Sequence, residues 1–317
     1  MPEEKPPFQT RCVSSLAKVF ADEALSEPPW NRGTALWSET YAFQVAYYSE
    51  SSIYPLRVVV SSELAPWTTV RSVGLSPSEL PTYAHSDHHV LRRTPGLYPD
   101  PLEPLASDGI RAYPGQWRSI WVTVALPSLD EWTASRGTSE DARSFPIDVR
   151  FEDETGELLG AERFVLDVLP VELPEQRLVH TEWFHCDCLA TYYQVEIFGE
   201  RHWELIERYA AGAVSHGMNM LLTPLFTPPL DTAVGGERPT VQLVDVERTT
   251  EGEYRFGFDK LIRWVEMCDR IGIRYLEFSH LFTQWGAKHA PKIVATVLED
   301  GEKKERKIFG WETDATG

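Results

Sequence analysis

The distribution of apolar residues along this chain changes once, close to Pro170. Before that point, short runs rich in β-branched and aromatic residues alternate with Pro, Gly, Ser and Asp. Closely spaced strands and turns of this kind are typical of an antiparallel β-sandwich. After Pro170, strand-like runs alternate with helical patterns, which is typical of a parallel α/β unit. The sequence therefore predicts a multi-domain protein with one β unit and one α/β unit.

The first unit is predicted to be a β-sandwich over residues 1–170, followed by a linker over residues 171–176. Within it, Glu154-Thr-Gly-Glu lies between two strand-like runs and predicts a hairpin turn. Residues 95–114 are rich in proline and have no periodicity, so we expect them to form a long surface loop.

The second unit, residues 177–317, begins a regular alternation of strands and helices. Residues 200–216 and 258–271 each place apolar side chains on one helical face and are followed by a glycine. The flanking strand-like runs are residues 178–184, 218–223 and 273–279. This order predicts the first strands and helices of a (β/α)8 TIM-type barrel. A complete barrel needs about 250 residues, so we expect this one to be incomplete.

Two hairpins are expected to interrupt the alternation, on the loops after the second and third strands. Residues 241–246 pair plausibly with 253–258, and residues 292–298 with 306–311. In a βα barrel the loops that follow the strands form the working face. The second unit is therefore where a ligand site is expected.

The net charge limits the class of partner. The chain has 30 Lys and Arg against 48 Asp and Glu, which gives a formal net charge of −18. Nucleic acid or an anionic membrane would need clustered Lys and Arg, so we expect neither as a partner. No apolar run of about 18 residues occurs, and the first residues do not resemble a secretory signal. The four cysteines are too few for a disulfide framework, so reduced thiols and a cytoplasmic location are predicted.

Polar clusters follow each predicted strand of the second unit. His185 and Asp187 lie just past the first strand, and Asp231 ends a proline-rich loop after the second. After the third strand, Trp285 is followed by Lys288 and His289, a pattern that suits an aromatic platform for a sugar ring. Two alternatives stay open at these positions: a metal site that includes His185 and Asp187, and ordinary buried or packing side chains.

Other familiar chemistries have no motif in the sequence. There is no G-x-S-x-G elbow, no phosphate-binding loop, no dinucleotide-binding turn and no H-E-x-x-H. The group His85-Ser-Asp-His-His precedes the proline-rich segment of the first unit and is interpreted as surface polarity. We therefore predict no cofactor and no bound metal.

The predicted strand ends resemble those of glycoside hydrolase family 123. The strings that carry the resemblance are Glu182-Trp-Phe-His-Cys-Asp, Leu222-Thr-Pro-Leu-Phe-Thr-Pro-Pro-Leu-Asp-Thr and Trp285-Gly-Ala-Lys-His-Ala-Pro-Lys-Ile, with Pro95-Gly-Leu-Tyr-Pro-Asp-Pro-Leu and Phe309-Gly-Trp-Glu-Thr-Asp-Ala beside them. The resemblance is strongest to an uncharacterised bacterial branch. It implies a β-N-acetylhexosaminidase-like fold and galactosamine-type substrates.

The resemblance also implies a substrate-assisted mechanism, in which an adjacent Asp-Glu pair follows the fourth barrel strand. The adjacent Asp-Glu pairs here begin at Asp22, Asp130 and Asp153, all in the first unit, so no catalytic residue is assigned. The family's substrate-facing rim maps onto six positions. These are His185, Asp187, Asp231, Trp285, Lys288 and His289.

Three functional hypotheses follow. The first is the N-terminal portion of a hydrolase that removes a terminal N-acetylhexosamine from a glycan, with its catalytic pair beyond residue 317. The second is a non-catalytic carbohydrate-binding protein, and the third is a small metallohydrolase. Because an open barrel exposes strand edges, self-association is also expected.

Overall fold

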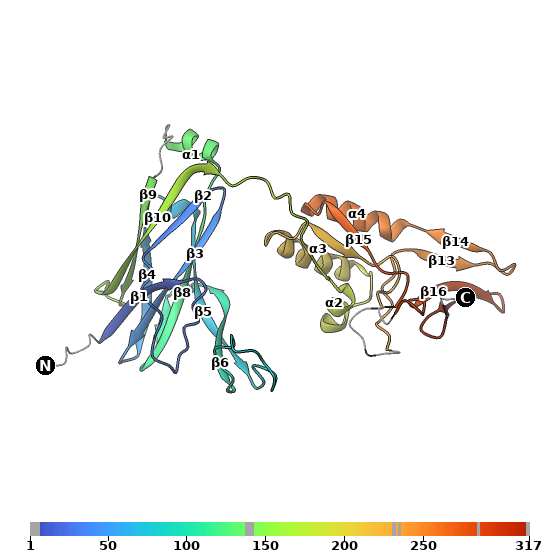
Figure 1. Ribbon diagram of the computed structural model, residues 1–317, viewed down its shortest axis with the longest axis horizontal. Helices are drawn as coiled ribbons and strands as arrows, with labels where there is room; N and C mark the ends of the chain where they lie inside the picture. Colours follow the sequence, from blue (N-terminus) through green and yellow to red (C-terminus); the bar gives the residue numbers. More distant parts are fainter. Residues whose placement is uncertain (1–6, 137–142, 230–232, 234–235, 284–285, 315–317) are drawn as a thin grey trace. The chain divides into compact units, whose positions relative to one another are not determined.

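The computed structural model describes residues 7–136, 143–229, 233, 236–283 and 286–314. The chain divides into two compact units, Met1–Pro174 and Glu175–Gly317, each with its own hydrophobic core (Figure 1). In these described ranges, no helix is long and apolar enough to cross a lipid bilayer.

The first unit is built from two five-stranded sheets. Its strands are β1 Phe8–Ser14, β2 Arg32–Trp37, β3 Thr40–Ser49, β4 Ile53–Ser61, β5 Thr68–Ser78, β6 Gly96–Pro104, β7 Ile110–Ala112, β8 Gln116–Ala125, β9 Arg143–Glu152 and β10 Leu158–Glu172. One sheet has the order β1-β3-β8-β5-β6 and the other β2-β10-β9-β4-β7. Neighbours are antiparallel except β2 and β10, which pair in parallel. The predicted β-sandwich and its hairpin turn between β9 and β10 are confirmed.

Aromatic side chains fill the space between the two sheets of the first unit. Phe43 of β3 and Phe164 of β10 are fully buried, and their rings stack with centroids 4.0 Å apart. The helix α1, Leu129–Arg136, adds Trp132, which packs edge-on against Phe145 of β9. A single 3₁₀ turn, Ala65–Trp67, lies between β4 and β5. The main core of the first unit therefore lies between its two sheets, and a smaller separate cluster contains Val13, Val19 and Ala46.

The prediction of a long surface loop over residues 95–114 is wrong. This segment contains β6, which pairs with β5, and β7, which pairs with β4. Proline is tolerated in β6 because β6 is the edge strand of its sheet, where a missing N–H costs no ladder hydrogen bond. Proline density therefore indicated an edge strand and not a loop.

The second unit has two small sheets and three helices. The strands are β11 Thr181–Glu182, β12 Met220–Thr223, β13 Asp245–Arg248, β14 Tyr254–Gly257, β15 Tyr275–Phe278, β16 Ile293–Glu299 and β17 Glu302–Phe309. The helices are α2 Cys186–Tyr193, α3 Glu200–Val214 and α4 Asp259–Ile271. One sheet is parallel with the order β11-β12-β15, and the other has the order β14-β13-β16-β17. Two hairpins are present where they were predicted, β13–β14 and β16–β17, although β13 begins at Asp245, four residues later than expected.

Helices cover one face of the parallel sheet. Leu221 of β12 and Leu276 of β15 pack into the same core as Trp203 of α3 and Trp264 of α4. The apolar periodicity that predicted α3 and α4 is confirmed, and α4 ends at Gly272, whose φ of 90° is the left-handed conformation of a helix cap. The described residues hold three parallel strands, so the complete TIM-type barrel stays a prediction.

Candidate functional site

The segments that follow β12 and β15 are tied together at the carboxyl ends of these two strands. Ser279 donates its backbone N–H to the carbonyl of Thr223 at 3.0 Å and its hydroxyl to the carbonyl of Phe226 at 3.2 Å. Further along, Thr227 forms an isolated antiparallel bridge with Lys292. Ligand sites of parallel α/β folds are formed at this end of the strands. These loops are therefore the candidate site.

The polar cluster after β11 starts a helix. His185 is the N-cap of α2 and is half-buried, and Asp187 lies in the first turn. The strand predicted over residues 178–184 is therefore shorter than expected, because the chain turns into α2 at Cys186. Only the two residues Thr181 and Glu182 pair with β12.

Asp187 forms a buried ion pair with Arg238. The Asp187 side chain is 4% exposed and the Arg238 side chain 10%, and Arg238 Nε donates to Asp187 Oδ2 at 3.0 Å. Arg238 Nη2 also donates to the sulfur of Cys188 at 3.1 Å. A buried carboxylate requires such a compensating cation. Asp187 therefore fixes Arg238, which lines the site, and joins α2 to the segment after β12.

His202 holds the start of α2 in place from the neighbouring helix α3. Its Nδ1 accepts a hydrogen bond from the backbone N–H of Phe198 at 2.9 Å, and its Nε2 lies 2.9 Å from the carbonyl of Cys186. Because Nδ1 accepts, the ring is neutral with its proton on Nε2. Burial lowers the pKa of His202 below its usual range, which keeps the ring neutral.

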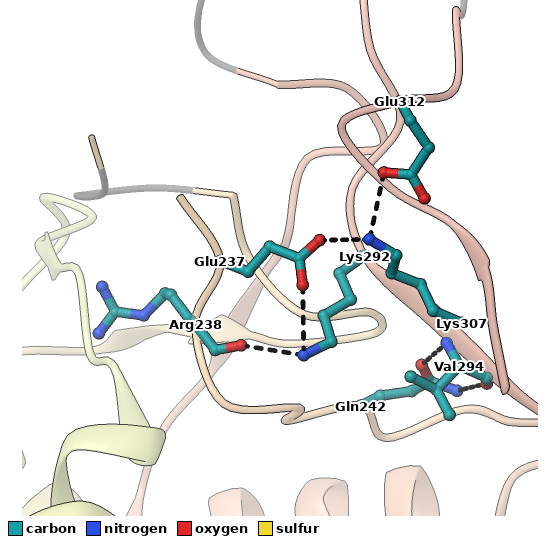
Figure 2. Close-up of polar contacts among 7 residues, drawn as sticks. All are labelled: Glu237, Arg238, Gln242, Lys292, Val294, Lys307 and Glu312. Carbon is teal, nitrogen blue, oxygen red and sulfur yellow. Dashed lines mark hydrogen bonds and ion pairs between the residues drawn. The ribbon is translucent and has the colours of Figure 1, made fainter. Parts of the chain in front are cut away.

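A chain of charged side chains borders the site on the side of β16 and β17 (Figure 2). Glu237 accepts from Lys307 Nζ at 2.7 Å and lies 3.6 Å from Lys292 Nζ, which also donates to the carbonyl of Arg238 at 3.3 Å. Lys307 donates to Glu312 as well, at 3.1 Å. The hydrogen bonds to Glu237 and Glu312 raise the pKa of Lys307. Glu237 is therefore fully engaged with cations.

Gln242 joins the second hairpin to the segment after β12 (Figure 2). Its side-chain nitrogen donates to the carbonyl of Val294 at 2.8 Å, and its side-chain oxygen accepts from the backbone N–H of Val294 at 3.0 Å. This pair of bonds imitates a strand partner for the start of β16. The loops at the strand ends are thus held by side chains as well as by backbone pairing.

A small cavity lies between these loops. Its volume is about 20 Å³, room for roughly one water molecule and too small for a sugar ring. Thr227 and Thr283 line it, and each has a buried hydroxyl without a hydrogen-bond partner among the described residues. Other lining residues are Pro229, Arg238, Pro291, Lys292 and Trp311. A sugar would therefore have to bind on the open surface beside this cavity.

The predicted rim residues after β15 are only partly gathered at this place. His289 is half-buried and stacks on Trp311, with ring centroids 4.5 Å apart, while Lys288 is exposed. Asp231 and Trp285 lie outside the described residues. Two of the predicted residues reach this cavity indirectly. Arg238, the partner of Asp187, and Trp311, the stacking partner of His289, both line it.

The sequence reasoning did not single out Trp183, Glu277 or Arg238. Glu277 lies in β15 and accepts from the indole N–H of Trp183 at 3.4 Å and from the hydroxyl of Thr181 at 3.3 Å. A signal for Glu277 was present, because it is the one carboxylate inside an otherwise apolar strand run. No local pattern marked Arg238, since its partner Asp187 is 51 residues away.

The two carboxylates nearest the cavity are held in ion pairs. Asp187 is paired with Arg238, and Glu237 with Lys307. Among residues 7–314 that are described, no three His, Cys, Asp or Glu side chains are grouped to hold a metal ion. All four cysteines are free thiols.

Comparison with known proteins bears on this site. Residues 183–315 match the family model of the glycoside hydrolase 123 catalytic domain, a segment that includes every loop described above. The chain is similar to glycoside hydrolases of family 123. Its fold also matches a solved family 123 glycoside hydrolase from Clostridium perfringens, studied for glycolipid glycan hydrolysis, with a TM-score of 0.69 at 11% identity.

The match to the clostridial structure covers 95% of the family 123-like chain and 52% of the other chain, so this chain spans about half the length of that enzyme. At this identity the match shows the fold. A sialic acid-binding region of a Streptococcus sanguinis adhesin aligns over 80% of this chain and 48% of its own at 11% identity, but the TM-score of 0.23 is too low to indicate a shared fold. No curated protein sequence matches the chain.

Proposed function

We propose that this protein is the N-terminal portion of a hydrolase that removes a terminal N-acetylhexosamine from a glycan by the family 123 route. The observation that carries the proposal is the catalytic-domain match over residues 183–315, which falls on the loops at the ends of β11, β12 and β15. In this proposal the three parallel strands are the first strands of a (β/α)8 barrel. Residues 1–170 are its β-sandwich domain, residues 171–176 the linker, and residues 177–317 the start of the catalytic domain.

The six rim positions are proposed to contact the sugar and not to react with it. The buried pair of Asp187 and Arg238 supports a positioning role for Asp187, and the stacking of His289 on Trp311 supports a fixed donor or acceptor beside the cavity. The remaining members are His185, Asp231, Trp285 and Lys288. The free thiols support a reducing, cytoplasmic setting for this protein.

The catalytic pair is proposed to lie beyond residue 317. A substrate-assisted hydrolase needs an Asp to orient the 2-acetamido group and a Glu to protonate the leaving oxygen. The Asp-Glu pairs in this chain sit elsewhere: Asp22 is paired with Arg92, Asp130 starts α1, and Asp153 closes the β9–β10 turn. None of them is on the parallel sheet, so the chemistry must be supplied by other residues.

The test is an assay of the 317-residue chain for two activities at once. With N-acetylgalactosamine in a ligand-observed NMR titration we expect saturable binding, and with an aryl N-acetyl-β-galactosaminide we expect no release of the aryl group. Turnover by this chain would overturn the placement of the catalytic pair. Absence of binding to any N-acetylhexosamine would overturn the proposed function as a whole.

The second candidate is a non-catalytic carbohydrate-binding protein. It is favoured by one observation, the engagement of Asp187 and Glu237 in ion pairs, which suits side chains that position a ligand. The coding sequence after Gly317 distinguishes the two candidates. If the reading frame continues past Gly317 into a further strand that ends in Asp-Glu, the hydrolase is supported, and if it stops there, the binding protein is.

A further inference from the structure

The parallel sheet of the second unit has one face that the helices leave uncovered. Leu221 and Leu276 are register partners, and both pack into the core beneath α3 and α4. Side chains alternate along a strand, so the neighbouring register partners Leu222 and Glu277 point to the opposite face. Thr181 of β11 is a register partner of Met220 and shares this face with them. A carboxylate therefore lies on the face that carries no helix.

Glu277 bridges the two outer strands on this face. Its Oε2 accepts from the hydroxyl of Thr181 at 3.3 Å, and its Oε1 accepts from the indole N–H of Trp183 at 3.4 Å. Leu222, on the strand between them, is 0% exposed. Both hydrogen bonds are longer than usual, and a carboxylate has about four acceptor sites. Glu277 thus holds Trp183 in place and retains acceptor capacity.

Trp183 presents its ring to solvent although it is anchored at its nitrogen. The side chain is 47% exposed, and His280 lies beside it with ring centroids 6.4 Å apart and the ring planes at 80°. A tryptophan held at one end and open on its surface is typical of a binding platform. His280, which is also exposed, adds a hydrogen-bonding group at the edge of this platform.

We propose that Trp183 and Glu277 form a subsite for a neutral hexopyranose ring, which stacks its apolar face on Trp183 and donates adjacent hydroxyls to Glu277. An anionic sugar fits poorly, because the carboxylate of Glu277 would repel it. The inference rests on the proposed function in taking a sugar as the ligand. It adds two contact residues, Trp183 and Glu277, to the six rim positions and states which part of the sugar each one recognises.

The structure offers a matched control for each residue. Trp30 of the first unit is 46% exposed and also uses its indole N–H, in a 3.2 Å bond to the hydroxyl of Tyr41, so it equals Trp183 in exposure and anchoring. Glu182 is the control for Glu277, because it is an exposed carboxylate on the same sheet whose partner is His180 at 3.3 Å.

The experiment measures the Kd of the 317-residue chain for N-acetylgalactosamine by ligand-observed NMR. We expect Trp183→Ala to weaken binding about tenfold, Trp183→Phe to retain part of the affinity, and Glu277→Gln to weaken binding about three- to tenfold. Trp30→Ala and Glu182→Gln should bind like the wild type. Melting curves establish that each variant is folded, and Trp183→Phe keeps the test valid if the alanine variant unfolds.

Two results would overturn the subsite in distinguishable ways. If the wild type binds and Trp183→Ala and Glu277→Gln bind equally well, the subsite is wrong while the proposed function stands with its sugar elsewhere. If the wild type binds no N-acetylhexosamine, the proposed function fails and this inference fails with it.

Discussion

The uncovered sheet faces of the two units carry different side chains. On the sandwich, cross-strand ion pairs such as Arg163 with Asp148, 2.6 Å apart, occupy the outer surface, as expected of a face that meets only water. On the parallel sheet, the face without helices presents Trp183 and Tyr275, 47% and 46% exposed, around the carboxylate of Glu277. Exposed aromatic rings are costly for solubility and indicate an interaction surface. The comparison teaches that the outer face of the sandwich carries paired charges, whereas the parallel sheet keeps exposed aromatic rings around a carboxylate.

The largest effect is expected from the core that makes the first unit self-sufficient. Phe164→Ala removes a ring that is fully buried and stacked on Phe43, so unfolding of the first unit should lose about 3–5 kcal/mol. The control is Phe278→Ala in β15, where the side chain is 58% exposed and the loss should stay below about 1 kcal/mol. Denaturant titration followed by circular dichroism measures both. Equal losses of unfolding free energy in the two variants would contradict the contrast between the closed core of the first unit and the open face of the second.

The next effect concerns the buried ion pair of the second unit. Asp187→Ala leaves Arg238 buried without this counter-charge and should cost about 3 kcal/mol of unfolding free energy. The matched control in the sandwich is Asp148→Ala, whose exposed pair with Arg163 should contribute less than about 1 kcal/mol. The double variant Asp187→Leu with Arg238→Met should regain part of the loss. If the Asp187 and Asp148 variants lose equally little, Asp187 does not organise the site.

A smaller, pH-dependent effect should appear in the second unit alone. Burial lowers the pKa of His202, so the unfolded chain binds a proton at higher pH than the folded one. The stabilising contribution of neutral His202 is complete above pH about 6.5 and is lost as the pH falls through the lower folded pKa. Thermal melts between pH 7.5 and 5 should show this loss, and His202→Gln should flatten it. The described histidines of the first unit, His85, His88 and His89, are exposed, so its stability should not follow this profile.

The smallest effect is expected on self-association. In the described part of the second unit β15 is an edge of the parallel sheet, and Phe278 and Phe282 beside it are 58% and 48% exposed. Sedimentation velocity should detect concentration-dependent dimers, and Phe278→Glu should weaken dimerisation by about three- to tenfold. Leu97→Glu, on the edge strand β6 of the sandwich at 50% exposure, is the control and should change nothing. A purely monomeric wild type would contradict the expectation.

Local periodicity was sufficient to predict the long elements. The β character of the first unit and the helices α3 and α4 were visible in the sequence, because these elements bury regular faces. Elements whose formation depends on tertiary contacts could not be predicted from the sequence. The prolines of β6 are accepted only at a sheet edge, and α2 starts where His202 of α3 meets the carbonyl of Cys186. Neither condition can be read from neighbouring residues.

The sequence located the candidate site better than it identified the contacts within it. The polar clusters after the strands lie on loops at the carboxyl ends, since parallel strands bring those ends to one edge. The partners of those clusters were missed because Arg238 and Glu277 reach theirs over 51 and 94 residues. Trp183 was read as part of a polar cluster, and its role depends on a carboxylate two strands away.

Hydrogen exchange by mass spectrometry, with and without saturating N-acetylgalactosamine, tests the division between the two units most directly. We predict slower exchange in the sugar-bound state for peptides covering residues 181–185 and 275–283, and no change in residues 8–136 and 143–172. Protection confined to the sandwich, with none at the ends of β11 and β15, would contradict the assignment of the ligand face to the second unit.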